Sequence, residues 1–279
     1  MSYLNNPMGT RPNFDGRMKS GSEGRLVGHS PMLPVNRLGY AREAATSHRV
    51  TLVQHFPLFS NLSPRDCAEV VSKAREREYP RSHTIHLEGD PVRQVVLLTS
   101  GSAKMIQFGP NGSAVILRVY GPGELIGTLG LSTEGRHCST AQALRHSTAL
   151  VWDAIDFECM SKQYPAMRLN VAYTFSKQLG DMQDRFREIS TERVASRLSR
   201  QIVRLMGQIG HRSNGTVEIS ISREELAQLV GTTLFTVSRL LSDWDKRGIV
   251  KTARESVSVH NVQSLQELSE TVGQMPLKR

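Results

Sequence analysis

The chain has 279 residues, room for about two domains, and a formal net charge of +9, which suits a polyanionic partner without identifying one. It lacks a run of about 20 apolar residues and a charged-then-apolar leader, which argues against a membrane span and a secretion signal. Its three cysteines, Cys67, Cys138 and Cys159, stand far apart, so they predict no disulfide framework and no paired-cysteine metal site, and they suit a reducing cytoplasm.

Residues 1–50 are rich in Gly, Pro, Asn, Ser and Arg and contain few large apolar side chains. This composition predicts a disordered basic arm. Such an arm is either a tail without a role or a segment that contacts DNA or a partner. Residues 48–59 read as the start of a helix that leads into the folded part.

Residues 51–164 read as a β-rich domain. A helix should begin after Ser63, since Ser63 can cap it and Pro64 suits its first position. Short apolar runs then alternate with glycine-bearing turns, and strands that recur about every 8 to 12 residues predict an antiparallel barrel or sandwich. A helical pattern returns over residues 152–164.

A long helix is predicted over residues 165–190, because Pro165 suits a helix start and the following apolar residues are spaced three and four apart. We expect this stripe to form a dimer interface; packing against the barrel of the same chain is the alternative. The predicted interface residues are Phe175, Leu179, Met182, Phe186 and Ile189. Charged residues such as Asp181 and Arg185 flank the stripe, as solvated positions would.

Residues 191–265 contain the pattern of a winged helix-turn-helix. The first helix, over about 192–209, has Arg193, Arg197, Arg200 and Arg204 along one side, which either face DNA phosphates or form a solvated face. Alternating apolar residues over 216–221 and 257–259 predict small strands that flank the central motif. We interpret residues 266–279 as a C-terminal tail.

The central motif is two short helices joined by a tight turn. Ser222 and Glu225 form the sequence signature of a capping box, and Gly231 suits the left-handed turn that ends the first helix. Thr232 or Thr233 should cap the second helix. Its buried face comprises Val237, Leu240, Leu241 and Trp244. In a helix-turn-helix the second helix enters the DNA major groove, whereas an ordinary helical hairpin is the alternative.

Three motifs stand in a specific order. Leu87-Glu88-Gly89-Asp90 with Gly101 lies in the predicted barrel, residues 123–131 follow it, and residues 231–239 open the second helix of the turn motif. In this order, residues 55–262 resemble the Crp/Fnr family of bacterial transcription regulators. The resemblance implies an α+β fold: an N-terminal antiparallel β-roll or jelly-roll sensor domain, a long dimerisation helix and a C-terminal winged helix-turn-helix.

The resemblance also implies a cytoplasmic, sequence-specific regulator that is no enzyme. It would bind an inverted repeat as a homodimer, with half-sites about one helical turn apart, and RNA polymerase is a candidate partner. A second hypothesis is a regulator that binds DNA constitutively and whose barrel is purely structural. A third is a cupin-like metal enzyme, because His83, His86 and Glu88 alternate along one predicted strand.

The resemblance places an effector pocket in the barrel. In the family's cyclic-AMP receptors a Glu binds the ribose and an Arg binds the cyclic phosphate, and these positions fall on Thr128 and Cys138 here. Because a buried phosphate needs a fixed cation, we expect the effector not to be cyclic AMP. The candidate pocket residues are Gly123, Glu124, Leu125, Gly127, Thr128, Arg136, Cys138, Ser139 and Thr140.

The sequence also bears on two other cofactors of the family, the iron–sulfur cluster and haem. No cysteine precedes Cys67, so we expect no iron–sulfur cluster. The histidines that could ligate a haem are His83, His86, His137 and His146. A lone strand histidine is more often a core or surface residue. Cys138, beside Arg136, is either a redox-sensing thiol or a small barrel residue.

The resemblance assigns the base contacts to Phe235 and Arg239. An arginine can donate to guanine O6 and N7, and an apolar ring can contact a thymine methyl, unless Phe235 packs in the core. Thr232 and Thr233, with free backbone N–H groups, would suit a phosphate. The predicted DNA-binding residues are Arg223, Thr232, Thr233, Leu234, Phe235, Thr236, Ser238 and Arg239.

Overall fold

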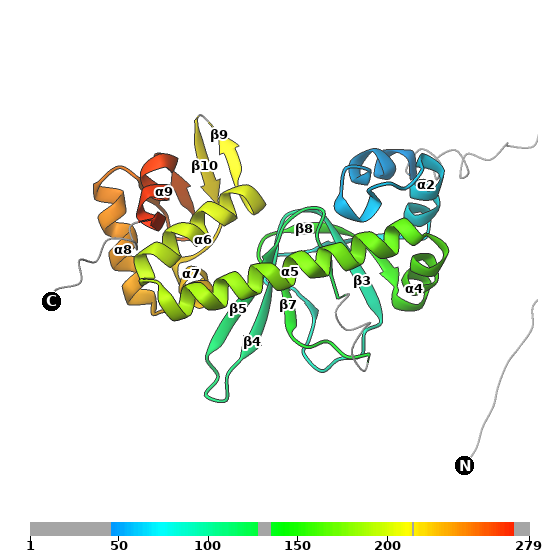
Figure 1. The fold of residues 1–279 in the computed structure, drawn as a ribbon, viewed down its shortest axis with the longest axis horizontal. Coiled ribbons are helices and arrows are strands. Elements are labelled where there is room, and N and C mark those ends of the chain that lie inside the picture. Colours follow the sequence, from blue (N-terminus) through cyan, green and yellow to red (C-terminus); the bar gives the residue numbers. More distant parts are fainter. Residues whose placement is uncertain (1–45, 128–134, 214, 271–279) are drawn as a thin grey trace, which may run out of the picture.

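The computed structural model describes residues 46–127, 135–213 and 215–270. A β-roll lies at one end of the molecule and a smaller helical domain at the other, and one long helix, α5, runs past both (Figure 1). Residues 46–53 are helical, which agrees with a helix leading into the roll, whereas residues 1–45 of the predicted arm lie outside the described ranges. The predicted α+β architecture is confirmed.

The β-roll consists of two four-stranded antiparallel sheets, in the orders β1-β8-β3-β6 and β2-β7-β4-β5. The strands are β1 (Arg75–Tyr79), β2 (Thr84–His86), β3 (Gln94–Ser100), β4 (Ala103–Phe108), β5 (Ala114–Tyr120), β6 (Leu125–Ile126), β7 (Thr140–Ala143) and β8 (Ser147–Asp153). Successive residues of a strand point to opposite faces of the sheet, so one strand can contribute to two core clusters. Val95 and Leu97, for example, pack in one core cluster and Val96 and Leu98 in another.

Three short helical segments cover the outer face of the roll: η1 (Pro57–Phe59), α2 (Pro64–Ser72) and α4 (Ala154–Gln163). Ser63 caps α2 as predicted, since its hydroxyl accepts the Asp66 N–H at 3.1 Å. The Trp152 indole donates to the Val70 carbonyl at 2.8 Å, which fixes α2 on β8 through a fully buried hydrogen bond.

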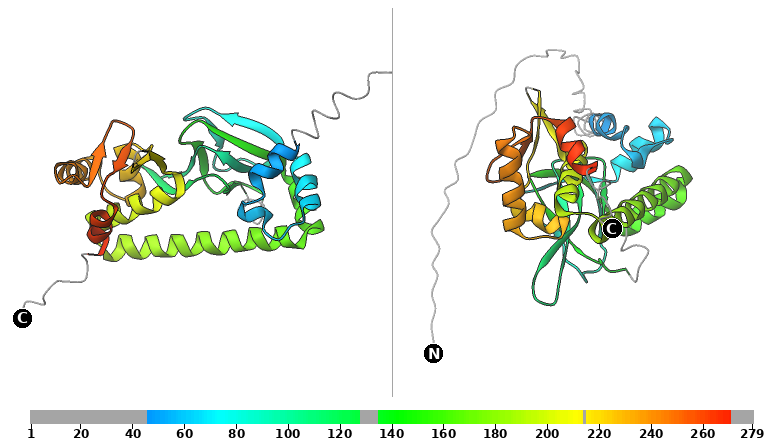
Figure 2. Two further views of the ribbon diagram at one scale, coloured as in Figure 1. Left: turned by 90° about the horizontal axis from the view of Figure 1, so that it is seen from above. Right: turned by 60° about the vertical axis from the view of Figure 1, so that its left-hand side comes forward.

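The long helix α5 (Pro165–Thr191) ends one residue beyond its predicted limit, and α6 (Val194–Ile209) follows after a short break. Figure 2 shows α5 along one edge of the molecule, with the other elements on one side of it. No helix within the described ranges has the length and apolar character that a membrane crossing requires.

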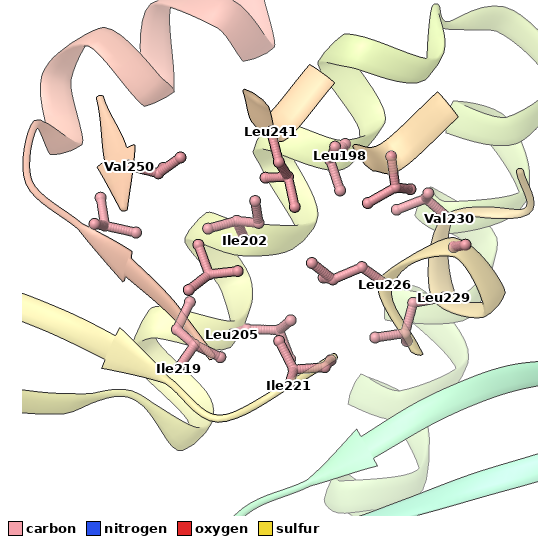
Figure 3. Packing of buried hydrophobic residues seen from close by; sticks show 14 of the residues in the cluster. Leu198, Ile202, Leu205, Ile219, Ile221, Leu226, Leu229, Val230, Leu241 and Val250 are labelled. Carbon is pink, nitrogen blue, oxygen red and sulfur yellow. The ribbon is translucent and has the colours of Figure 1, made fainter. Parts of the chain in front are cut away.

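The C-terminal domain combines a small sheet, in the order β11-β12-β10-β9, with four helices. After α6 its elements are β9 (His211–Ser213), β10 (Thr216–Ile219), α7 (Arg223–Val230), α8 (Leu234–Lys246), β11 (Val250–Thr252), β12 (Val257–Val259) and α9 (Val262–Glu270). Apolar residues from α6, α7, α8 and the strands meet in one core (Figure 3). The expected winged helix-turn-helix is therefore present.

The local signals of the turn motif act as predicted. The capping box between Ser222 and Glu225 is complete in both directions, and Gly231 has a φ of 64°, which a side chain would disfavour. Of the two candidate caps, Thr233 is the residue that caps α8.

The C-terminal domain is docked on the roll. Ile116 and Val119 of β5 belong to the same buried cluster as the helix-turn-helix. Beside it, the Lys104 ammonium lies 2.7 Å from the Glu225 carboxylate, and both side chains are largely buried. The capping-box glutamate therefore also ties α7 to β4.

The final helix, α9, corrects the prediction of a tail from residue 266. It packs on α6, with Leu265 fully buried, and the Ser199 hydroxyl donates to the Leu265 carbonyl. Its apolar positions are few, so the helical period was not evident in the sequence. Residues 271–279 lie outside the described ranges.

We predict that Leu265→Ala lowers the free energy of unfolding by about 2–5 kcal/mol, because it removes a fully buried side chain and leaves a cavity. Val262→Ala is the control in the same helix, since Val262 is exposed and should change stability by less than about 0.5 kcal/mol. Urea denaturation of both variants measures the difference. Equal effects would show that α9 does not depend on this contact.

Candidate nucleic-acid interface and effector cavity

The first two turns of α8 are presented to solvent. The side chains of Leu234 and Phe235 are 50% and 76% exposed, and Arg239 is exposed on the same helix. The opposite face, with Val237, is buried. The alternative that Phe235 packs in the core is therefore wrong, because residues one helical turn apart share a face and Phe235 is not on the buried one.

Hydrogen bonds within the turn organise its threonines. The Thr236 N–H donates to the Thr233 hydroxyl at 3.2 Å, and the two hydroxyls lie 3.0 Å apart. The Thr232 N–H donates to the Ala227 carbonyl at 3.0 Å, so the expectation that this group is free for a phosphate is wrong. Ser238 is half-buried on the following turn. The cap thus positions the start of α8.

Arg223 lies apart from the other predicted DNA-binding residues. It begins α7, and its guanidinium donates to the Thr252 hydroxyl of β11 at 2.9 Å. The side chain therefore joins the first helix of the motif to the strand that leads into the wing.

The arginines of α6 do not form a phosphate-facing stripe. Arg197 is buried and donates to the carbonyl groups of Ile189, Glu192 and Val230, at 3.2, 3.1 and 3.1 Å. Helix C-termini leave such carbonyls without partners, and a guanidinium with five donors can satisfy several. The prediction of a phosphate contact is thus wrong for Arg197, which instead joins the ends of α5 and α7.

Two further α6 arginines pair with buried carboxylates of the α5 end. Arg204 donates to Glu188 at 2.9 Å, and Arg200 lies 3.3 Å from Glu192 and 3.6 Å from Glu188. Both carboxylates are almost fully buried. Both cations are therefore engaged within the chain, and the phosphate interpretation stays a prediction for them.

Arg185 is a residue whose role the sequence did not reveal. Its position beside the apolar stripe predicted a solvated charge, but the guanidinium is largely buried and donates to the carbonyls of Leu117, Ile116 and Leu229. It therefore connects α5 with β5 and with the C-terminal end of α7. The carbonyl groups around Arg185 come from segments that are distant in the sequence. The helical period of α5 therefore could not predict that this side chain is buried.

The predicted dimerisation stripe of α5 is largely uncovered within the chain. Leu179, Met182, Phe186 and Ile189 are exposed, with Phe186 at 73%. Phe175 is half-buried. Packing against the barrel of the same chain, the alternative for this stripe, is therefore wrong for these four residues.

The predicted effector residues are divided between two cavities. Leu125, Gly127, Cys138 and Ser139 line a cavity of about 20 Å³ inside the roll. Gly123 and Glu124 instead line a cavity of about 700 Å³ between the roll, α5 and α6.

Two other candidates, Arg136 and Thr140, do not line the roll cavity. Arg136 is exposed and donates to the Gly89 carbonyl at 2.7 Å, and the Thr140 hydroxyl accepts the Glu88 N–H at 3.1 Å. Thr128 lies outside the described residues. The prediction of one shared pocket is therefore wrong, because Arg136 and Thr140 hold the turn after β2 and Glu124 faces the second cavity.

Two of the side chains that line the roll cavity stack on each other. The imidazole rings of His86 and His137 are stacked, with centroids 3.5 Å apart and an interplanar angle of 5°. Burial, together with repulsion from His137, lowers the pKa of His86 to about 3, and burial also lowers the pKa of His137. Both rings are therefore neutral near pH 7, and the remaining space holds about one water molecule.

The cavity that the described residues enclose inside the roll is much smaller than a typical ligand pocket. Ligand pockets measure about 300–1,000 Å³, far above the 20 Å³ that remains here. The residues that line the described part of the cavity include no Arg or Lys to bind a cyclic phosphate. His86, one of the four histidines considered as haem ligands, stacks on the ring of His137.

Stability should fall as the pH is lowered from 6.5 toward 3, because His86 binds a proton more readily in the unfolded chain than in the fold. One such group contributes a slope of up to about 1.4 kcal/mol per pH unit. We predict that His86→Gln reduces this slope, whereas His260→Gln, at an exposed position, retains it. Urea denaturation across this range measures the slopes; identical slopes for the two variants would contradict the burial of a neutral His86.

Comparisons with known proteins agree with this architecture. Residues 76–164 match the model of the cyclic nucleotide-binding domain and residues 192–268 that of the Crp-like helix-turn-helix domain, together more than half of the chain. The chain is 23% identical over 210 residues to the CRP-like cAMP-activated global transcriptional regulator of Mycobacterium tuberculosis, covering 75% of this chain and 94% of that protein.

A second relative is the cyclic AMP receptor protein of Thermus thermophilus, 27% identical over 213 residues, with 76% of this chain and 96% of the relative covered. The solved structure of FixK2 from Bradyrhizobium japonicum shares the fold, with a TM-score of 0.63, 21% identity and coverage of 70% and 96%. The proteins of this family are regulators, which removes the metal-enzyme hypothesis. The chain belongs to the Crp/Fnr family of DNA-binding transcription regulators.

Proposed function

We propose that two copies of the chain bind an inverted repeat in DNA and thereby regulate transcription in the cytoplasm, with RNA polymerase as a further partner. The observation that carries the proposal is the exposed start of α8, where Leu234, Phe235 and Arg239 project from a rigid helix. Side chains at the start of a recognition helix are those that reach base edges in the major groove.

The chemistry of these side chains suggests which bases of the DNA they contact. Arg239 would donate two hydrogen bonds to guanine O6 and N7. Phe235 and Leu234 cannot hydrogen-bond to a base through their side chains, but their apolar groups can contact thymine methyl groups. The capped start of α8, with the hydroxyls of Thr233 and Thr236, would lie near a phosphate. Ser238 would contact either a phosphate or a base edge. We therefore expect a half-site in which a G·C pair lies near A·T pairs.

The exposed stripe of α5 supports the proposed dimer. Apolar residues at spacings of three and four form the seam of a two-stranded coiled coil. Leu179, Met182, Phe186 and Ile189 would become buried against the same residues of the second copy. The two recognition helices would then meet half-sites about one helical turn apart.

The effector is left open by the family. The stacked pair of His86 and His137 supports a regulator whose roll binds no cyclic nucleotide. DNA binding would then be constitutive or would respond to a ligand at another site. Cys138, an exposed cysteine on the rim of the roll cavity, remains a candidate redox-sensing residue.

Replacing Arg239 tests the base contact. We predict that Arg239→Ala weakens binding to the preferred DNA site by about 1–3 kcal/mol and relaxes specificity at one base pair. Arg65→Ala is the control, since Arg65 is an exposed residue of α2 and the substitution removes the same charge. Selection from random DNA followed by fluorescence anisotropy measures both effects. Equal weakening on every sequence would make Arg239 a phosphate contact.

A charge in the seam tests the dimer. We predict that Phe186→Glu converts the dimer to a monomer at micromolar concentration, because it buries two like charges across the two-fold axis. Ile155→Glu makes the same change at an apolar residue of α4 that is 77% exposed and outside the seam, and it should remain dimeric. Sedimentation velocity separates the species. A dimeric Phe186→Glu variant would place the interface elsewhere.

A further inference from the structure

Apolar contact attaches the C-terminal domain to the roll. Ile106, Ile116 and Val119 of the roll lie in the same buried cluster as residues of α6, α7 and α8. The hydrophobic effect follows the buried area and has no preferred direction, so this contact holds the domains together without selecting one angle between them. The angle therefore depends on contacts that have a direction, which are hydrogen bonds and ion pairs.

Two ion pairs join the roll to the C-terminal domain within the ranges that the structure describes, and they differ in burial. The Lys104 ammonium of β4 lies 2.7 Å from the Glu225 carboxylate of α7, and these side chains are 13% and 11% exposed. Arg81, in the turn after β1, pairs with Glu255 in the turn of the wing, where the side chains are 45% and 51% exposed. Exposed pairs contribute little, because water and salt screen both charges. The buried pair is therefore the stronger constraint.

The Glu225 carboxylate uses both of its oxygens. Oε1 accepts a hydrogen bond from the Lys104 ammonium, and Oε2 accepts the N–H and the hydroxyl of Ser222, both at 2.9 Å. Burial acts to raise the pKa of Glu225, but the hydrogen bonds from Lys104 and Ser222 outweigh it, so the pKa is lowered and the carboxylate is charged at neutral pH. Lys104 therefore ties the first turn of α7 to one point on β4.

The other end of α7 is also fixed. Arg185 of α5 donates to the Leu229 carbonyl, and Arg197 of α6 donates to the Val230 carbonyl at 3.1 Å. The helix has eight residues and a length of about 12 Å. A short helix that is held at both ends has little freedom to pivot. Because α8 packs against α7, its direction relative to α5 and the roll is fixed as well.

We propose that Lys104 is a positioning residue for DNA binding: through Glu225 it fixes the direction of α8, and thereby the spacing between half-sites that the dimer accepts. This inference rests on the proposed function, in which two copies pair along α5 and bind an inverted repeat. A preorganised dimer loses little freedom on a site that matches it and must be distorted to bind any other. Without the Lys104 ammonium, α7 would stay attached at its C-terminal end, and α8 could adopt several angles.

Lys104→Met tests the proposal, since it retains an unbranched side chain and removes the charge. The probes are DNA duplexes that carry the selected inverted repeat with its central spacer unchanged, lengthened or shortened by one base pair. Fluorescence anisotropy gives the ratio of the affinity for the unchanged spacer to that for the altered spacers. We expect this ratio to fall by about tenfold in Lys104→Met, as the loss of one charge-assisted hydrogen bond would produce.

Arg81→Met is the matched control, because it removes a cation from the exposed interdomain pair. It should change the ratio of affinities by less than about threefold. A duplex with a single half-site separates positioning from stability, since its affinity should be the same for the wild type and both variants. An unchanged ratio in Lys104→Met, or equal weakening on every duplex including the half-site, would overturn the proposal.

Glu225→Gln tests whether Lys104 acts through Glu225. Glutamine can replace glutamate in a capping box, so the start of α7 should be retained while the partner of Lys104 loses its charge. We expect Glu225→Gln to lower the ratio of affinities as Lys104→Met does, and the double variant to lower it no further. Additive effects of the two substitutions would contradict action through this pair.

A measurement that needs no DNA distinguishes this proposal from the proposed function. Spin labels at Ser72→Cys in α2 and Ser242→Cys in α8, both exposed positions, report the distance between the roll and the recognition helix. The exposed Cys138 and Cys159 are replaced by serine, and labelled chains are diluted with unlabelled ones. Double electron–electron resonance should give a broader distance distribution when Lys104→Met is added.

Arg81→Met should leave the distance distribution unchanged, since its ion pair is exposed. A broader distribution for Lys104→Met in a protein that does not bind the inverted repeat would contradict the proposed function and support the role of Lys104. A wild type that discriminates between spacers, with the distribution and the ratio unchanged in Lys104→Met, would do the reverse.

Discussion

The orientation of the recognition helix depends on buried guanidinium groups that satisfy helix-end carbonyls. Arg185 reaches Leu229 and Arg197 reaches Val230, so two arginines from α5 and α6 hold the last residues of α7. Each hydrogen bond to a charged group contributes about 1.5–3 kcal/mol, and a carbonyl left buried without a partner would cost a similar amount. The end of α7 is therefore fixed to the long helix, and α8 begins only four residues later.

This junction explains how the two domains are coupled. Glu188, at the end of α5, is buried among arginines of α6, while Arg185 connects the same helix to β5 of the roll. A buried ion pair tolerates little displacement, because separating its members leaves an uncompensated charge in an environment of low dielectric constant. A change in the position of α5 relative to the roll would thus be transmitted to α7.

The roll illustrates how a shared fold departs from the ligand associated with it. The strands and turns are those of a cyclic nucleotide-binding domain, yet the interior is occupied by the rings of His86 and His137. Two neutral imidazoles in van der Waals contact contribute packing in place of a polar ligand, and their protonation is disfavoured by burial. The fold is retained because the sheets are held by their own core, which does not require an occupant.

The sequence alone determined the features that depend on short-range chemistry. The capping box at Ser222, the left-handed turn at Gly231 and the period of α5 are encoded within a few residues, and all were predictable. Tertiary structure decided which charges are buried. The residues next to Arg185 and Arg197 in the sequence do not distinguish these arginines from exposed arginines on a helix. Likewise, the stacking of His86 on His137 joins segments 51 residues apart, so no local pattern indicates that these two rings meet. Burial and pairing are properties of contacts between distant segments, and only the folded chain defines them.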